Sequence, residues 1–248
     1  MDLGLEGKVA LVTAGSKGIG RGIADGLSAE GVKVAVTSRS TERAEQVAGE
    51  IDGCGYAFDS DDLDAIPALL EAVQSDLGPI DIYVANTGGP PAGDPLSFSR
   101  AQWEAAQRSL LISPMTIIER LVPTMSERGF GRIVAIGSMA VTEPIDALQL
   151  SNAHRPGLVA AFKVLARQHA AAGITFNHVH PGRIATDRMI DTAGSLEAAQ
   201  EQARKLVPAE RLGTVEECAV AAVFLCSQPA AYINGTAILV DGGLTRSV

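Results

Sequence analysis

The sequence predicts an α/β fold in one domain, residues 1–248, built on a doubly wound parallel sheet of about seven strands with helices on both faces. Short runs rich in Val, Ile and Leu alternate along the chain with longer stretches of helical periodicity, which is typical of strands joined by crossover helices. A glycine-rich segment directly follows the first of these runs. No repeat, low-complexity tract or Pro/Ser-rich linker divides the 248 residues, so we expect no domain boundary.

Each expected strand is a short run of aliphatic and β-branched residues, and each expected helix is a longer stretch of helical periodicity. The expected strands are at 9–13, 32–37, 55–58, 82–85, 132–136, 175–178 and 237–240. The expected helices, one after each of the first six strands, are at 18–29, 42–51, 63–76, 100–128, 152–171 and 215–227. Two helices begin with capping-box pairs, Ser99 with Gln102 and Thr214 with Glu217.

Two long loops, residues 88–96 and 181–187, follow the fourth and sixth expected strands. In an open parallel sheet, ligands bind outside the carboxyl ends of the strands, where both loops emerge. We therefore expect the functional site at that edge of the sheet, with residues 88–96 and 183–206 defining the substrate.

The composition excludes several classes of partner. A formal charge of −9 without any Lys/Arg cluster argues against nucleic acid and against an anionic membrane surface. Residues 1–8 are too polar and too short for a signal peptide, and no apolar run approaches the ~18 residues that a membrane span needs, so we expect a cytoplasmic location. Cys54, Cys218 and Cys226 have no CxxC spacing, and we expect small core residues rather than a disulfide framework or a metal site.

A glycine-rich loop lies between the first strand and the first helix. It consists of Gly15, Ser16, Lys17, Gly18, Ile19 and Gly20. Glycines here let the backbone turn sharply and approach a pyrophosphate, which free N–H groups and the positive end of the helix stabilise. A merely structural turn is the alternative, but the position between a buried strand and a helix favours a dinucleotide site.

The end of the second strand indicates which dinucleotide fits. A site for NAD usually has an acidic residue there for the ribose 2′-hydroxyl, whereas this chain has Ser38 and Arg39, with Lys17 in the facing loop. Two cations suit a 2′-phosphate, so we expect NADP rather than NAD. The alternative is that both cations are solvated surface charges.

Several motifs together resemble those of the short-chain dehydrogenase/reductase family. They are ThrAlaGlySerLysGlyIleGly at 13–20, Asp59, AsnThrGly at 86–88, IleGlySer at 136–138, ProGlyArgIleAlaThr at 181–186 and IleAsnGlyThrAlaIleLeuValAspGlyGly at 233–243. The resemblance covers essentially the whole chain and is greatest to the ketoacyl-carrier-protein-reductase-like branch. It implies a Rossmann-like sheet, a nicotinamide dinucleotide, a small carbonyl or alcohol substrate, and a homotetramer or homodimer.

The resemblance also implies cofactor contacts. Asp59 would border the adenine, and Asn86 and Gly88 the ribose side. The motif near the nicotinamide would contribute Pro181, Gly182, Ile184 and Thr186. Asn86 and Asp241 have an alternative role as turn residues that bond their own backbone.

The chain departs from the family at the residues of its proton chemistry. The family uses a serine, a tyrosine further along the chain, a lysine one helical turn after that tyrosine, and an asparagine in an earlier helix. The corresponding positions are Ser138, Ser151, Arg155 and Leu110, while the tyrosines are Tyr56, Tyr83 and Tyr232. Arg155 can still bond ribose hydroxyls, but an unassisted serine is a poor general acid. Loss of a positioned acid costs roughly 10² to 10⁴ in rate, so slow reduction remains possible.

Two histidines are candidate substitutes for the missing acid, because histidine titrates near neutral pH. His154 lies three residues after Ser151, which allows a serine–histidine relay on one helix face. His180 ends the sixth strand near the expected nicotinamide. A packed or surface role is the alternative for both, and it is the role expected of His169 and His178.

Arg183 and Arg188 lie in the segment that would cover a substrate. They are candidates for binding a carboxylate or phosphate, and exposed ion pairs are the alternative.

More than one function remains open at this point. The intact cofactor motifs and Ser138 favour an NADP-dependent oxidoreductase resembling 3-oxoacyl-carrier-protein reductases, with Ser151 and Arg155 in place of tyrosine and lysine. The joint change at three catalytic positions favours instead a non-catalytic dinucleotide-binding regulator or assembly subunit. A third interpretation, an elimination served by Ser138 and Ser151, has no sequence feature specific to it.

Overall fold

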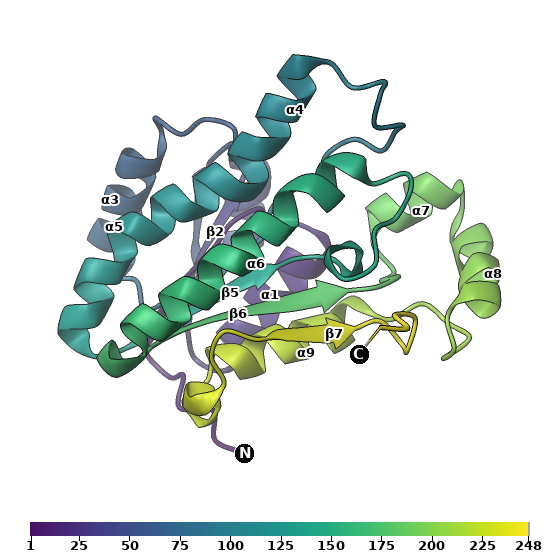
Figure 1. Ribbon diagram of the computed structural model, residues 1–248. Coiled ribbons are helices and arrows are strands. Elements are labelled where there is room, and N and C mark those ends of the chain that lie inside the picture. Colours follow the sequence, from purple (N-terminus) through teal and green to yellow (C-terminus); the bar gives the residue numbers. More distant parts are fainter. Residues whose placement is uncertain (248) are drawn as a thin grey trace.

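The computed structural model describes residues 1–247, within which seven parallel strands form one sheet in the order β3-β2-β1-β4-β5-β6-β7 (Figure 1). The strands are β1 Val9–Val12, β2 Lys33–Ser38, β3 Cys54–Ala57, β4 Ile82–Ala85, β5 Gly131–Ile136, β6 Ile174–Pro181 and β7 Ala237–Val240. The strand order reverses between β1 and β4, and a crevice opens at the carboxyl ends on either side of such a reversal. The predicted fold class is confirmed.

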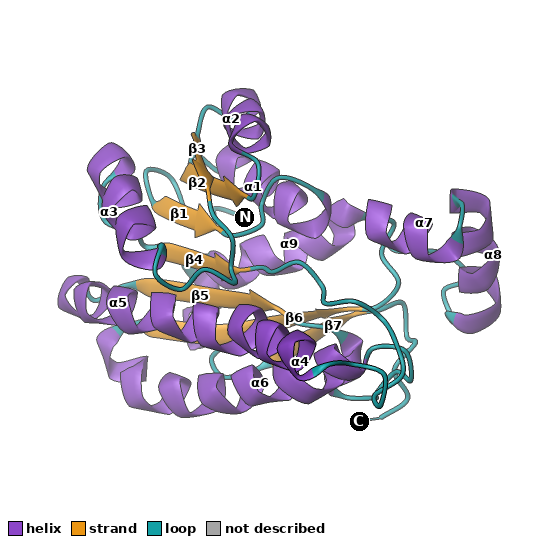
Figure 2. Ribbon diagram, turned by 90° about the horizontal axis from the view of Figure 1, so that it is seen from above, coloured by secondary structure: helices purple, strands orange, loops and turns teal. Residues whose placement is uncertain are grey.

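Helices cover both faces of the sheet (Figure 2). They are α1 Gly18–Ala29, α2 Thr41–Glu50, α3 Ile66–Leu77, α4 Arg100–Gln107, α5 Ser113–Arg128, α6 Gln149–His169, α7 Asp187–Ala193, α8 Leu196–Leu206 and α9 Val215–Cys226. Helices α1, α2 and α9 pack on one face, while α3, α5 and α6 pack on the other. Helices α7 and α8 lie beyond the carboxyl ends of the strands (Figure 1).

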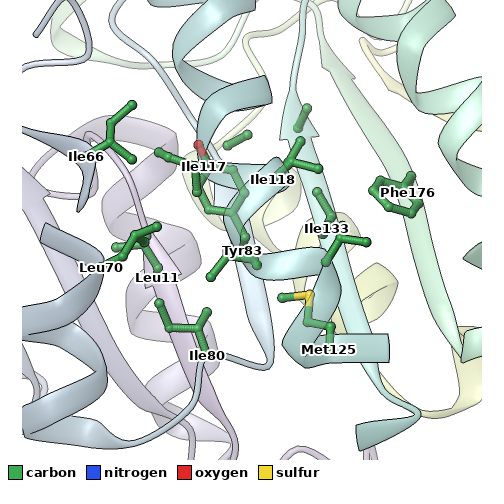
Figure 3. Packing of buried hydrophobic residues seen from close by; sticks show 14 of the residues in the cluster. Leu11, Ile66, Leu70, Ile80, Tyr83, Ile117, Ile118, Met125, Ile133 and Phe176 are labelled. Atoms are coloured by element: carbon green, nitrogen blue, oxygen red, sulfur yellow. The ribbon is translucent and has the colours of Figure 1, made fainter. Parts of the chain in front are cut away.

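The core consists of two apolar layers, one on each face of the sheet. On the α3, α5 and α6 side, Tyr83 and Ile133 from the strands pack with Ile117 from α5 (Figure 3). The neighbours of Tyr83 in β4, Ile82 and Val84, belong to the opposite layer, because successive strand residues point to opposite faces. Tyr83 is completely enclosed, and burial raises the pKa of its hydroxyl, so this tyrosine is no proton donor for the site.

Several element boundaries differ from the sequence expectation. Both capping boxes are present, at Ser99 and Thr214, as predicted. The expected helix at 100–128 is interrupted by a π-helical turn, Arg108–Ile112, which joins α4 to α5. Such a turn inserts one residue without breaking the helical hydrogen bonding, so amphipathic periodicity alone did not mark it. Strand β6 runs on past the expected end to Pro181 because it pairs with β7 as far as Val240.

The segment 183–206, expected as a loop, contains helices α7 and α8. Each begins at a hydroxyl cap: Thr186 Oγ1 accepts a hydrogen bond from Met189 N, and Ser195 Oγ accepts one from Ala198 N. Helices this short are marginal by propensity alone. Their packing through Ala199 and Ala203, which are fully buried, stabilises them and is not visible in local sequence.

Three further expectations concern the chain as a whole. Within residues 1–247, no helix has the length and apolarity to cross a bilayer. Cys218 and Cys226 are buried and Cys54 is partly buried. The described residues contain no cluster of His, Cys, Asp or Glu arranged to hold a metal ion.

Candidate functional site

The turn between β1 and α1 leaves the first turn of the helix without a side-chain cap. Lys17 is the N-cap in an extended conformation, and no side chain accepts from the N–H groups that follow it. Positive φ occurs at Ala14 (47°) and Gly18 (54°). The left-handed positions of this turn are therefore Ala14 and Gly18, only one of which is a glycine. Uncapped N–H groups and the positive end of α1 together form an anion site of the kind that binds pyrophosphate.

Gly20 is required because two backbone segments approach closely there. A Cβ on Gly20 would lie 2.6 Å from the carbonyl oxygen of Ala14 and would also meet Nδ2 of Asn86. The Asn86 amide donates to that same carbonyl at 3.0 Å. Asn86 thus holds the β1–α1 turn and does not bond its own backbone, which excludes the turn alternative for this residue.

Two threonines that the sequence reading did not single out hold the same turn. Thr37, at the end of β2, accepts a hydrogen bond from Ala14 N at 3.1 Å through its hydroxyl. Thr13 donates its hydroxyl to Asn86 O at 2.8 Å. The ends of β1, β2 and β4 are thereby fixed to one another. A threonine as the last buried residue of a strand beside a glycine-rich turn is the signal that would have indicated them.

A cavity of about 730 Å³ follows this turn along the carboxyl ends of the strands. Its volume suits a small-molecule ligand. The expected cofactor residues that line it are Ser16, Lys17, Ser38, Arg39, Asp59, Asn86 and Gly88. Lys17 from the phosphate turn and Arg39 from the end of β2 bring two cations to this cavity, and Arg43 also lines it. The residues present therefore fit a dinucleotide whose ribose carries a 2′-phosphate.

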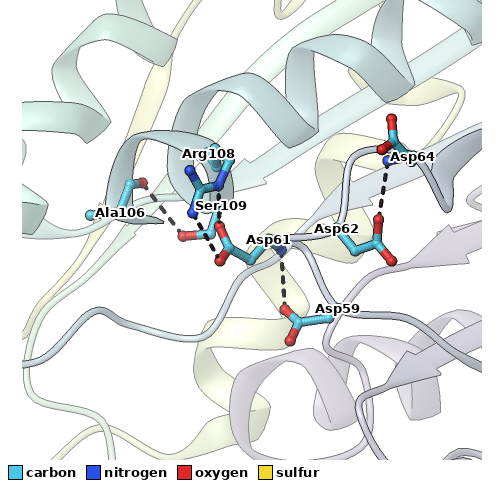
Figure 4. Close-up of polar contacts among 7 residues, drawn as sticks. All are labelled: Asp59, Asp61, Asp62, Asp64, Ala106, Arg108 and Ser109. Carbon is cyan, nitrogen blue, oxygen red and sulfur yellow. Dashed lines mark hydrogen bonds and ion pairs between the residues drawn. The ribbon is translucent and has the colours of Figure 1, made fainter. Parts of the chain in front are cut away.

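The loop after β3 also lines this cavity. Figure 4 shows the polar contacts of that loop. Asp59 Oδ1 accepts a hydrogen bond from Asp61 N at 3.1 Å. The Asp61 carboxylate in turn accepts from Arg108 Nε at 2.7 Å, which ties the loop to the π-helical turn. Asp59 lines the cavity, and its carboxylate also stabilises the loop that carries it.

At the reaction end, Ser151 and Arg155 form a hydrogen-bonded pair on α6. Arg155 Nε donates to Ser151 Oγ at 3.0 Å, and Arg155 Nη1 donates to Ile136 O at 2.7 Å. Burial, and secondarily the positive charge of Arg188, lower the pKa of Arg155 from 12.5 to about 10. Arg155 therefore remains charged at neutral pH. The four-residue spacing on one helix was the signal for this bond, which the sequence reading did not predict.

Ser138 lies two residues beyond the end of β5, directly before a short 3-10 turn. Its Oγ accepts from Ala140 N at 3.1 Å, so the hydroxyl keeps its proton for donation elsewhere. Because Arg155 bonds Ile136 O, one guanidinium connects Ser151 to the strand end that carries Ser138. Arg155 therefore directs two of its nitrogens toward the protein itself, at Ser151 and at Ile136.

The histidines are packed groups. The His154 ring meets the edge of Trp103 at 5.8 Å between centroids, and burial lowers its pKa. Ser151 bonds Arg155, and no Ser151–His154 hydrogen bond occurs among the described residues. Burial lowers the pKa of His178 to about 3 and that of His180 to about 4, and the His180 ring packs against Gly137.

Leu110 lies inside the π-helical turn and is 2% exposed. Its side chain belongs to the apolar interior and offers no polar relay, as its residue type indicated.

The segment after β6 crosses from the sheet to the phosphate turn. Gly182 N donates to Val240 O, and Ile184 is buried with its backbone bridged to Gly213. The Thr186 methyl lies 3.4 Å from where a Cβ on Gly18 would be, so Thr186 lies beside the phosphate turn. Within the described residues, Pro181, Gly182 and Ile184 support this arrangement but do not line the main cavity.

The remaining candidates are Arg183, Arg188 and Asp241, and they differ in their hydrogen-bond partners. Arg183 Nη1 donates to Gln202 Oε1 at 3.1 Å, and Arg188 Nη2 donates to Pro90 O at 2.7 Å. Neither forms an ion pair with a carboxylate of residues 1–247, so the ion-pair alternative is wrong for both. Asp241 does accept from Gly243 N and Thr245 N, as expected of a turn residue.

Comparisons with known proteins agree with this geometry. Residues 13–245 match the family model described as enoyl-(acyl carrier protein) reductase. The chain is 36% identical over 245 residues to the 3-oxoacyl-[acyl-carrier-protein] reductase FabG of Haemophilus influenzae, covering 98% of this chain and 100% of that protein. The L-sorbose reductase of Gluconobacter frateurii, solved with NADPH and L-sorbose, superposes with a TM-score of 0.94 at 30% identity over 100% of both chains. YwfH, an NADPH-dependent reductase involved in bacilysin biosynthesis, superposes with a TM-score of 0.91 at 28% identity, covering 97% of this chain and 99% of that one.

Proposed function

Because the chain belongs to the short-chain dehydrogenase/reductase family, we propose that it is an NADP-dependent oxidoreductase acting on a small carbonyl or alcohol substrate, in the manner of 3-oxoacyl-carrier-protein reductases. The observation that carries the proposal is the cavity with Lys17 and Arg39 at the end of β2 and the phosphate turn along its side. The two reductases whose structures superpose on this chain are described with NADPH, which supports the same cofactor here.

The phosphate turn would hold the pyrophosphate, and Lys17 and Arg39 would hold the 2′-phosphate. When bound, the nicotinamide supplies or accepts the hydride. Thr186, which lies beside Gly18, would orient the nucleotide near that turn. The chain's own contribution to the chemistry is to position the substrate oxygen and to stabilise the charge that develops on it.

Ser151 and Arg155 would together replace the tyrosine and lysine of the family. The Ser151 oxygen accepts a hydrogen bond from Arg155, so its proton is available to a substrate oxygen. Arg155 adds a fixed positive charge in a low-dielectric setting, where charge stabilisation is strongest. Ser138, whose oxygen is occupied by Ala140 N, would donate to the same substrate oxygen.

A two-part experiment tests this proposal. Calorimetric titration should detect NADPH binding at least tenfold tighter than NADH binding, since a 2′-phosphate gains charge-assisted bonds. Single-turnover absorbance with a panel of ketones, aldehydes and acyl thioesters should then record oxidation of bound NADPH. Binding of neither dinucleotide would end the proposal.

The Ser151→Ala variant isolates the proposed proton donor. Removing one preorganised donor should lower the single-turnover rate by roughly 10²-fold and leave NADPH affinity unchanged. Ser126→Ala is the matched control, because Ser126 bonds Val122 O on α5 and should alter neither quantity. An unchanged rate in Ser151→Ala would show that His154 or Ser138, and not Ser151, donates the proton.

A non-catalytic dinucleotide-binding regulator is the second candidate. It is favoured by the buried histidines of β6, because burial lowers the pKa of His178 to about 3 and that of His180 to about 4, so neither ring is an acid that titrates near neutral pH. Stereospecific transfer of deuterium from labelled NADPH to any carbonyl compound would exclude it.

We also propose that the protein is a homotetramer or homodimer. A groove of about 580 Å³ along α5 and α6 is lined by Leu111, Met115, Ile118 and Leu165. Val164, on α6, is 55% exposed. Covering such apolar helix surface is what a second copy of the chain would do. Light scattering should give a mass of two or four chains, and Met115→Glu should lower it; a monomer in the unmodified protein would refute this.

A further inference from the structure

Arg188 reaches from α7 across to the loop that follows β4. Its Nη2 donates to Pro90 O at 2.7 Å, and a Cβ on Gly89 would overlap its guanidinium. The guanidinium can lie against the backbone only because residue 89 is glycine. Although Arg188 as a residue is exposed, its guanidinium loses water against this backbone, which lowers its pKa.

A second guanidinium lies close by, and nothing in the described chain neutralises either one. The loop that Arg188 bonds also pairs with the residues just before α6, where Gly93 N donates to Ala147 O at 2.9 Å, and α6 carries Arg155. Burial lowers the pKa of Arg155, and the positive charge of Arg188 lowers it further. No carboxylate within residues 1–247 lies at ion-pair distance from these two arginines. Asp94 accepts from Leu96 N, and Glu143 accepts from the backbone of the C-terminal tail. These two positive charges therefore have no counter-ion among the described residues.

The phosphates of the dinucleotide would bind residues other than these two arginines. The main cavity is lined by Lys17, Arg39 and Arg43, and neither Arg155 nor Arg188 lines it. Arg155 lies instead with Ser151 at the reaction end, and Arg188 lies on the helix that follows the nicotinamide motif. An anion placed between these arginines would thus belong to the substrate.

We propose that Arg188 determines substrate specificity by binding a carboxylate, so that the substrates are oxo acids and the corresponding hydroxy acids. Arg188 would exchange its bond to Pro90 O for a two-pronged bond to the carboxylate, a geometry that guanidinium favours. Arg155 adds electrostatic attraction for the carboxylate while it keeps its hydrogen bond to Ser151. The identification of the anion as a substrate rests on the proposed function, whereas the anion site itself can be tested without turnover.

The binding arm uses the protein saturated with NADP⁺, which cannot reduce a carbonyl. Calorimetry compares 2-oxopentanoate and 4-oxopentanoate with their methyl esters, which differ only in the charge. The acids should bind at least tenfold more tightly than the esters, and Arg188→Gln should abolish this preference. Arg188→Lys should keep part of it, and Arg204→Gln, which alters an exposed ion pair on α8, should keep all of it. Equal binding of acids and esters by the unmodified protein would overturn the proposal.

The kinetic arm separates this site from cofactor binding and from the reaction itself. Arg188→Gln should lower kcat/KM for the acids about tenfold to a hundredfold, mainly through KM, and leave kcat/KM for the esters unchanged. A tenfold loss of NADP⁺ affinity in Arg188→Gln would assign the arginine to a cofactor phosphate and refute the proposal. Equal reduction of acids and esters would refute the anion site but keep the oxidoreductase. Tight acid binding without any NADPH oxidation would keep the anion site but refute the oxidoreductase.

Discussion

The two buried histidines of β6 should make the protein sensitive to mild acid. His178 and His180 are 3% and 2% exposed, and within the described residues Nε2 of His178 and both ring nitrogens of His180 lack hydrogen-bond partners. Burial lowers their pKa values to about 3 and about 4 from 6.5. Because the unfolded chain binds protons on these rings at a higher pH than the folded chain does, stability falls as the pH falls below 6.5.

The size of the effect follows from the same values. Lowering the pH from about 7 to about 5 costs about 2 kcal/mol for each ring, at 1.36 kcal/mol per pH unit below 6.5, and about 4 kcal/mol for both. Carboxylates with lowered pKa values lose their contribution mainly below this window. The pKa of Glu217, for example, is lowered to about 2 by Arg211, so its contribution is lost only below its ordinary value of 4.5.

Urea denaturation at about pH 7 and about pH 5 measures this loss as the difference between the two free energies of unfolding. The double variant His178→Leu and His180→Leu should lose most of the difference, whatever its absolute stability. Phe162→Leu is the control, because Phe162 packs on His178 at 4.5 Å between ring centroids but does not titrate. It should destabilise the protein equally at both pH values. A double variant that still loses about 4 kcal/mol would refute the reasoning.

Three further changes test the cofactor turn. Arg39→Ala should weaken NADPH binding about tenfold in calorimetry and leave NADH binding unchanged, because only the 2′-phosphate loses a partner. Equal losses of NADPH affinity and NADH affinity would contradict this. Gly20→Ala should abolish binding of both dinucleotides while circular dichroism stays native, since its Cβ would lie 2.6 Å from Ala14 O. Ala14→Gly should raise the free energy of unfolding by about 0.5–1 kcal/mol, because release of the strained φ of 47° outweighs the added chain entropy; a destabilised variant would show that Ala14 is not strained.

The parts of the fold that were predictable are those written in local sequence. The strand at 82–85 and the helix at 18–29 have the predicted bounds, because a short aliphatic run and an amphipathic stretch each mark their own limits. The capping boxes at Ser99 and Thr214 were equally local. The end of β6 was not predictable, because it depends on pairing with β7. Helices α7 and α8 likewise depend on packing between segments.

Some parts of the site were also predictable from local sequence, and others were not. The cations Lys17 and Arg39 were predictable from their places beside a strand end and a glycine-rich turn, and both line the cavity. The clamp by Thr37 and Asn86 was not, since it joins residues of different strands. The left-handed conformation of Ala14 was not predictable either, because a glycine pattern shows only that such a conformation is allowed at the glycines themselves.

The Ser151–Arg155 bond bears on how hydride transfer would proceed without a strong acid. Reduction of a carbonyl places negative charge on oxygen, and a fixed cation stabilises this charge whether or not a proton moves at the same moment. A hydroxyl whose oxygen is held by Arg155 can align with the developing charge and then draw its proton from water. The rate of the chemical step would then depend little on pH between about 6 and 9, since no residue in this pair titrates there. A rate that follows a single ionisation near neutral pH would instead show that a histidine supplies the proton.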